Sequence, residues 1–120
     1  MIECLFVGVG GFIGSVCRYL IGLIPLKVEN GFPVKTFVIN IAGAFLISLL
    51  TAFASKQKTI NPQILLMLKV GICGGFTTFS TFAFETADLM QKGSVAVAIA
   101  YMVFSLLLGV LAVFAAQTLV

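Results

Sequence analysis

The stretch GGFTTFSTFAFE, residues 74–85, decides how this chain folds. Two glycines open it, hydroxyl groups occupy four of the five positions 77–81, and phenylalanine recurs at 76, 79, 82 and 84. Adjacent glycines weaken a helix, and hydroxyl side chains compete for the backbone groups that a helix would use. The stretch therefore predicts a helix that is broken between Gly74 and Thr77.

The composition indicates which solvent surrounds that helix. Of the 120 residues, 61% are apolar and only 9% are charged. Soluble domains carry about a quarter charged residues, because their surfaces face water. We therefore expect a lipid-embedded protein, with residues 1–120 forming a single domain and no separate soluble domain.

Four apolar runs are each long enough to cross a bilayer, which takes about 20 residues. Residues 36–55 and 93–120 contain no charge, whereas Arg18 interrupts the first run and Lys69, Glu85 and Asp88 lie in the third. The third run starts after Asn61-Pro62, because proline is favoured at the first helical position. We predict an all-α membrane protein with four transmembrane helices at residues 2–24, 36–55, 62–90 and 94–117, the third of them broken.

The charges on the connecting loops hardly orient the chain. Lys56 and Lys58 lie on one side of a four-span arrangement, and Lys27, Lys35 and Lys92 lie on the other. Cytoplasmic loops normally carry an excess of Lys and Arg, and two against three is a negligible excess. Either an unseen signal sets the orientation or the chain inserts both ways. We favour dual topology, which permits an antiparallel homodimer.

Small residues recur at spacings that suit close helix packing. Gly10 and Gly14 form one GxxxG pattern, and Gly71 and Gly75 form another. Small faces let helix backbones approach one another in lipid, where no hydrophobic force drives helices together. They predict tight contacts within the bundle.

A helix break at membrane depth must be buried in protein or line a polar cavity, because lipid cannot satisfy the freed backbone groups. The two half-helices then direct carbonyl groups at a cation and N–H groups at an anion, which is a recurrent way of building an ion site. A helix that is merely kinked or flexible is the alternative.

The residues after the break suit a pathway for an anion. Phe79 and Phe82 are three residues apart and project near one another, beside Ser80 and Thr81. Aromatic rings have an electropositive edge, so two rings presented edge-on attract an anion without a full charge. Conduction requires binding that is weak enough to release the ion. Simple packing is the more common role of Phe in a membrane helix.

Polar residues in the other spans support this interpretation. Asn40 is an amide in the second span, and Arg18 in the first span suits a positive vestibule. In the fourth span, Tyr101 and Ser105 lie one turn apart, with Gly109 on the same face. Such residues are costly in lipid and tend to face a pathway or the bundle interior. With no acidic residue at mid-depth, an anion is favoured over a proton or a metal cation.

Other classes of function are excluded or disfavoured. The chain has no His, and its three cysteines lack the spacing of a metal site, so we expect no enzyme and interpret the cysteines as packing residues. The run LFVGVGGFIGS is similar to a dinucleotide-binding turn, but Ile13 replaces the expected third glycine and no βαβ unit follows.

Three motifs along the chain point to a known family. They are GGFIGSVCRY (10–19), TFVINIAGAF (36–45) and the most specific, GICGGFTTFSTFAFE (71–85). Together they resemble the bacterial fluoride channel family known as Fluc or CrcB, and the resemblance covers the whole chain. It implies an antiparallel, dual-topology homodimer with two fluoride pores in the bacterial inner membrane.

The resemblance also implies roles for individual residues. Phe79 and Phe82 match the pore-lining rings, Asn40 the adjacent amide, and Tyr101 and Ser105 the polar track of the fourth span. The backbone carbonyls of Gly74 and Thr77 match those that hold a central sodium ion, which is structural and not transported. Gly109 departs from family members that have a hydroxyl at this position. Arg18 matches a position near the pore entrance, and Glu85 matches one at the end of the third helix.

The implied function is passive export of fluoride, which lowers its toxicity in the cytoplasm. A small multidrug-type exporter is the alternative, but such proteins use a glutamate in the first span and tryptophan, whereas here Glu3 is at the extreme end and Trp is absent. A structural subunit of a larger membrane complex is a third class.

Overall fold

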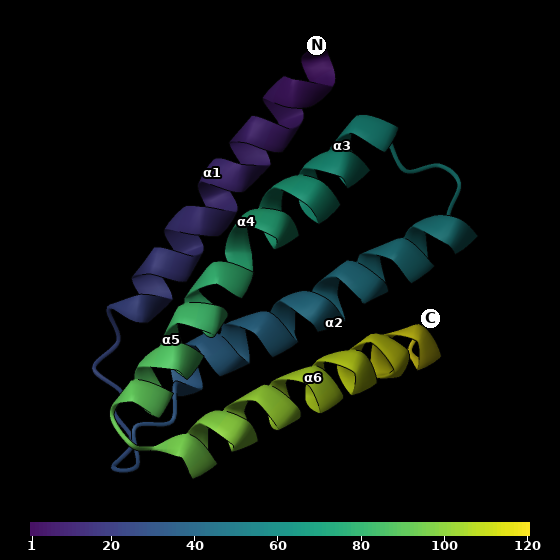
Figure 1. The fold of residues 1–120 in the computed structure, drawn as a ribbon. Helices are drawn as coiled ribbons and strands as arrows, with labels where there is room; N and C mark the ends of the chain where they lie inside the picture. The colour runs from purple at the N-terminus through teal and green to yellow at the C-terminus, as the bar shows by residue number, and fades with distance from the viewer.

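The computed structural model describes all 120 residues and contains helices but no strands (Figure 1). Three helices are long and continuous: α1 (Ile2–Gly22), α2 (Val34–Lys56) and α6 (Val95–Thr118). Between α2 and α6, the chain forms four shorter helices in succession. They are α3 (Pro62–Leu66), the π-helix η1 (Met67–Cys73), α4 (Gly74–Phe76) and α5 (Phe79–Gln91).

The predicted all-α membrane protein with four spans is confirmed. Ile2–Gly22, Val34–Lys56, Pro62–Gln91 and Val95–Thr118 are each long and apolar enough to cross a membrane. Only 13 of the 120 residues are buried within the chain, and large apolar side chains are exposed along all four spans. These side chains need lipid or another protein chain against them.

The third span begins as its sequence predicts. The side chain of Asn61 accepts hydrogen bonds from the backbone N–H groups of Gln63 (2.8 Å) and Ile64 (3.4 Å), and Pro62 occupies the first turn. An N-cap side chain satisfies donors that have no partner within the helix, and proline at the first position lacks such a donor.

Glycines bring α1 into direct backbone contact with the third span (Figure 1). A Cβ atom added to Gly75 would lie 2.7 Å from the Gly11 carbonyl oxygen, and one added to Gly71 would lie 2.8 Å from the Gly10 Cα. Added Cβ atoms on Gly10 and Gly14 would collide with the Met67 and Ile72 carbonyl oxygens. Both predicted GxxxG patterns therefore lie at one interface, where backbone packs on backbone.

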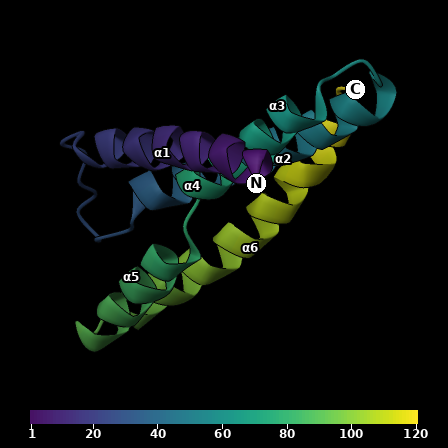
Figure 2. The ribbon, with the colours of Figure 1, turned by 90° about the horizontal axis from the view of Figure 1, so that it is seen from above.

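The other two spans form a second pair. Helices α2 and α6 run side by side, and the Ser48 hydroxyl on α2 donates a hydrogen bond of 2.8 Å to the Val113 carbonyl on α6 (Figure 1). Seen from above, α5 and the first half of α6 diverge from α1 (Figure 2). The chain must cross between the two pairs within the third span.

That crossing occurs at Thr77 and Thr78, which have extended backbone (φ −82°, ψ 157° and φ −149°, ψ 120°). The glycine pair expected to start the interruption is instead helical, with φ −64° and ψ −39° at Gly74. The reason is packing: Gly75 lies directly against the Gly11 backbone of α1, and the Thr77 side chain fills the space over Gly43 on α2, where a Cβ would collide with it.

Candidate functional site

Thr78, the second of the two extended threonines, is held by one side chain on a neighbouring helix. Asn40 on α2 accepts a hydrogen bond from the Thr78 N–H at Oδ1 (2.8 Å) and donates one from Nδ2 to the Thr78 carbonyl (3.1 Å). The amide thus replaces both backbone partners that a continuous helix would give Thr78. Because a side-chain amide carries two N–H groups, one N–H of Asn40 has no partner among the hydrogen bonds of the chain.

Hydroxyl groups provide further hydrogen bonds on both sides of Thr78. The Thr77 N–H and hydroxyl both donate to the Cys73 carbonyl (3.1 and 3.0 Å), and the Thr81 N–H donates to the Thr78 hydroxyl (3.1 Å), which caps α5. The Thr78 hydroxyl also lies 3.2 Å from Thr81 Oγ1 and 3.3 Å from Ser80 Oγ. The hydroxyl-rich sequence therefore stabilises the start of a new helix.

A central cavity of about 360 Å³ lies beside this crossing, between α2, the third span and α6. One of its lining residues is Ser105, whose buried hydroxyl is the only buried side-chain polar atom without a hydrogen-bond partner. Leaving a buried hydroxyl unpaired costs about 1–3 kcal/mol, which is consistent with a ligand completing the site. The cavity is lined by Asn40, Gly43, Ala44, Ile47, Cys73, Gly74, Thr77, Thr78, Phe79, Phe82, Ser105 and Leu106.

Aromatic rings form one wall of the central cavity. The rings of Phe79 and Phe82 lie 6.0 Å apart, and Phe82 packs edge-on against Tyr101 at 4.9 Å. Phe82 is half-buried, whereas 79% of Phe79 is exposed. Phe82 is therefore fixed within the chain, and Phe79 presents its ring at the surface.

Tyr101 lies outside the central cavity and belongs to a polar cluster that joins three spans. Its hydroxyl donates to Glu85 Oε1 (2.8 Å), and the Thr36 hydroxyl donates to Glu85 Oε2 (3.0 Å). The carboxylate thus links α2, α5 and α6. Sequence reasoning singled out Glu85 without deriving its role, although a charged residue in an apolar span calls for such partners.

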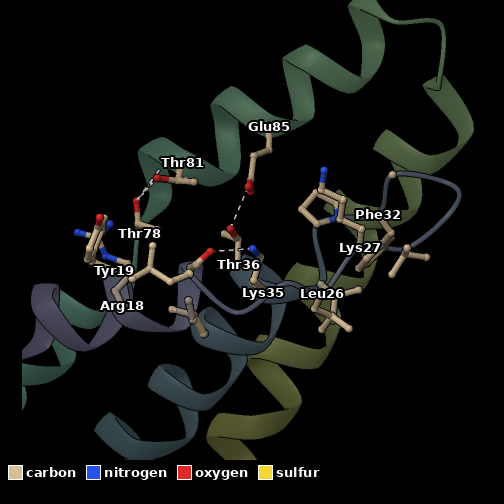
Figure 3. A pocket seen from close by; sticks show the side chains of 17 residues that line it. Arg18, Tyr19, Leu26, Lys27, Phe32, Lys35, Thr36, Thr78, Thr81 and Glu85 are labelled. Atoms are coloured by element: carbon tan, nitrogen blue, oxygen red, sulfur yellow. Dashed lines mark hydrogen bonds between the residues drawn. The ribbon is translucent and has the colours of Figure 1, made fainter.

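A second, wider cavity of about 540 Å³, the vestibule cavity, opens where α1 ends and α2 begins (Figure 3). It is lined by the cations Arg18, Lys27 and Lys35 and by the Glu85 carboxylate, and Thr78 lines both this cavity and the central one. The Arg18 Nε donates to the Gly75 carbonyl at 3.2 Å, where α4 nears its end. A cation is favoured at that end of a helix.

The structure gathers the residues proposed from the sequence into three groups. Asn40, Phe79, Phe82, Ser105, Gly74 and Thr77 line the central cavity, and Arg18 and Thr81 line the vestibule cavity. Ser80 contacts the Thr78 hydroxyl, and Tyr101 bonds to Glu85. Gly109 lies further along α6, where a Cβ would make an ordinary contact of 3.8 Å with Ile41.

A family model described as CrcB-like protein, Camphor Resistance (CrcB), matches residues 5–117. The chain belongs to the CrcB-like family. A relative from Chlorobaculum tepidum, named fluoride-specific ion channel FluC, is 42% identical over 119 residues, covering 99% of this chain and 94% of the relative. Relatives of the same name come from Chlorobium luteolum (47% identical; 77% and 71% covered) and Flavobacterium psychrophilum (41% identical; 93% and 91% covered).

The two bonds of Asn40 generate the first prediction. We expect Asn40→Ala to lower the free energy of unfolding by about 2 kcal/mol, because it leaves both backbone groups of Thr78 unpaired in a partly buried setting. Thermal unfolding in detergent measures the difference. Thr51→Ala is the matched control, since the Thr51 hydroxyl bonds only within its own helix, to the Ile47 carbonyl. Equal stability of the two variants would contradict this role for Asn40.

Proposed function

We propose that this protein is a fluoride channel of the bacterial inner membrane, through which fluoride leaves the cell passively. The single observation that carries the proposal is the central cavity, which places the unpartnered Ser105 hydroxyl and the free N–H of Asn40 beside the Phe79 and Phe82 rings. Its membership in a family whose relatives are named fluoride-specific ion channels supports the choice of anion. Those relatives are channels, not enzymes.

The lining of the central cavity suits a small anion that must pass through. It offers N–H and O–H donors and ring edges and contains no acidic or basic side chain. The nearest carboxylate, Glu85, has a hydroxyl donor on each oxygen, which holds it in place. Uncharged donors replace part of the water around the ion and still allow it to leave. A lipophilic cation would find no carboxylate in this cavity, so a multidrug-type exporter is not favoured.

The working unit that we propose is an antiparallel homodimer. The ring of Phe79 is largely exposed, and a Cβ added to Gly74 would meet nothing within 4 Å, although both residues border the central cavity. A second copy inserted in the opposite orientation would cover this face and close the cavity. The nearly balanced loop charges are consistent with both orientations.

A structural sodium ion on the axis of that dimer fits the backbone here. In a continuous helix the N–H of Thr78 would bond to the Gly74 carbonyl, and that of Thr81 to the Thr77 carbonyl. Both donors are diverted, to Asn40 and to the Thr78 hydroxyl respectively. The carbonyl oxygens of Gly74 and Thr77 thus lose their helical partners, and two chains would supply four oxygens, a donor set that suits a hard cation.

The membrane potential supplies the driving force for export. Hydrogen fluoride crosses a membrane as the neutral acid and dissociates at cytoplasmic pH, which traps fluoride inside. A potential of 100 mV, negative inside, favours the exit of each anion by about 2.3 kcal/mol. A pore that admits fluoride alone therefore suffices, and no proton exchange is required.

Fluoride efflux from liposomes tests the proposal. We expect the reconstituted protein to release fluoride quickly and chloride at least ~100-fold more slowly, a discrimination worth about 2.7 kcal/mol, without a proton gradient. Phe82→Ile should reduce fluoride release, because it removes a ring edge from the central cavity. Phe84→Ile is the matched control, since Phe84 lies on the same helix, is 73% exposed and does not line the cavity. Equal release of chloride, or dependence on proton exchange, would overturn the proposal.

A pair of serines on facing helices separates function from stability. Ser105→Ala should slow fluoride release without destabilising the protein, because its buried hydroxyl has no partner within the chain. Ser48→Ala should lower the unfolding temperature, because it removes the bond to the Val113 carbonyl. Efflux and thermal unfolding, measured on both variants, give the comparison. Ser105→Ala protein with normal efflux would remove that hydroxyl from the pathway.

A further inference from the structure

Lys69, in the π-helix η1, is the charged side chain of the spanning segments for which the chain provides no partner. Arg18, Lys35 and Lys56 donate hydrogen bonds to backbone carbonyls, and the acidic residues of the spans are hydrogen-bonded or paired. The Lys69 ammonium makes neither a hydrogen bond nor a salt bridge. A charge within a spanning segment is costly, and it therefore marks a candidate functional position.

Lys69 lines a groove of about 580 Å³ between α2, η1 and α6, which we call the Lys69 groove. Ser48, Thr51 and Ser55 line it from α2, but their hydroxyls donate to backbone carbonyls. Gln117 lines it from α6, and its amide has no hydrogen bond within the chain. The donors left free in the groove are thus the ammonium of Lys69 and the amide of Gln117, which suit an anion.

The backbone around Lys69 is also unusual. Met67–Cys73 forms seven residues of π-helix, a geometry that is rare and that occurs frequently at functional sites. The same segment provides Cys73 to the wall of the central cavity. The π-helix η1 therefore borders both the Lys69 groove and the central cavity.

The Lys69 groove is the third in a row of hollows along α2. Ile39 lines the vestibule cavity, Asn40 and Ile47 line the central cavity, and Ile47 and Ser55 line the Lys69 groove. From Thr36, in the vestibule cavity, to Ser55 the helix rises about 28 Å, close to the ~30 Å thickness of a bilayer's hydrocarbon core. The row thus spans the membrane, with Arg18 at one end and Lys69 at the other.

We propose that the Lys69 groove is a second anion-binding site, the opposite mouth of the pathway, which takes small inorganic anions from water. The inference rests on the proposed channel function and extends it to a residue outside the central cavity. A positive charge at the mouth of a pathway raises the local concentration of anions, and dissolved salt screens that effect.

Ionic strength provides the first test. At about 0.01 M salt, where charge acts over about 30 Å, we expect Lys69→Gln to slow fluoride efflux at least ~3-fold. At about 1 M salt, where charge acts over about 3 Å, the variant and the parent protein should agree. Lys58→Gln is the control, because Lys58 is exposed in the loop at the same end of the bundle and its change removes the same charge.

The second test restores a charge at position 69 by chemical modification of a cysteine. Cys4 and Cys17 are exposed, so Lys69→Cys is made together with Cys4→Ser and Cys17→Ser. A cationic methanethiosulfonate, reacting with the new thiol, should raise fluoride efflux at low salt, and an anionic one should lower it. Because both reagents act on the same protein, misfolding of the variant does not account for opposite effects.

The outcomes separate this inference from the function on which it rests. A parent protein that conducts no fluoride overturns the proposed function, and this inference with it. Normal fluoride conduction with no difference between Lys69→Gln and Lys58→Gln, and none between the two reagents, overturns the Lys69 groove alone. The inference also fails if the effect of Lys69→Gln follows the headgroup charge of the liposomes, phosphatidylcholine against phosphatidylglycerol, rather than salt, because the groove would then hold a lipid phosphate.

Discussion

The pair of hydrogen bonds between the Asn40 amide and the backbone of Thr78 is the constraint on which the rest of the structure depends. A backbone that leaves the helical path inside a membrane must find partners in protein, and Asn40 supplies both at 2.8 and 3.1 Å. The third span can therefore pass from the side of α1 to that of α6. The central cavity, the exposed Phe79 ring and the freed carbonyls of Gly74 and Thr77 all follow from that crossing.

Charge is arranged around the central cavity and not within it. Its lining offers hydroxyls, the Asn40 amide and ring edges, which are weaker than a full charge and so suit the release of an anion in the channel that we propose. The Glu85 carboxylate lines the vestibule cavity, where the Thr36 and Tyr101 hydroxyls hold both of its oxygens. Cations line the wider hollows at the two ends, Arg18 in one and Lys69 in the other.

Features that depend on local sequence were predictable, and features that depend on tertiary contacts were not. The four spans follow from hydropathy, the start of the third span from Asn61-Pro62, and the close contact of α1 with the third span from the GxxxG spacing. The glycine pair of the opening stretch was expected to break the helix, but it packs against α1 while remaining helical. The two extended residues are Thr77 and Thr78, and Asn40 supplies the backbone partners of Thr78.

The sequence predicted which residues belong to the site better than it predicted which contacts they make. Periodicity placed Ser105 and Tyr101 on one face of α6, yet Ser105 lines the central cavity whereas Tyr101 binds Glu85. Spacing along a single helix gives the side on which a residue lies, but the rotation of the neighbouring helix decides what it meets. The two hydroxyl partners of Glu85 lie on other helices, and so would any partner of Lys69. Neither outcome follows from spacing along one helix.

The central claim is that an uncharged, donor-lined crossing conducts fluoride in preference to chloride. The reversal potential tests it most directly, measured across a planar bilayer containing the purified protein, with a fluoride gradient and chloride present on both sides. The account predicts a reversal potential that follows the fluoride gradient and does not move when the chloride concentration on one side is changed. A reversal potential that moves with chloride would contradict it.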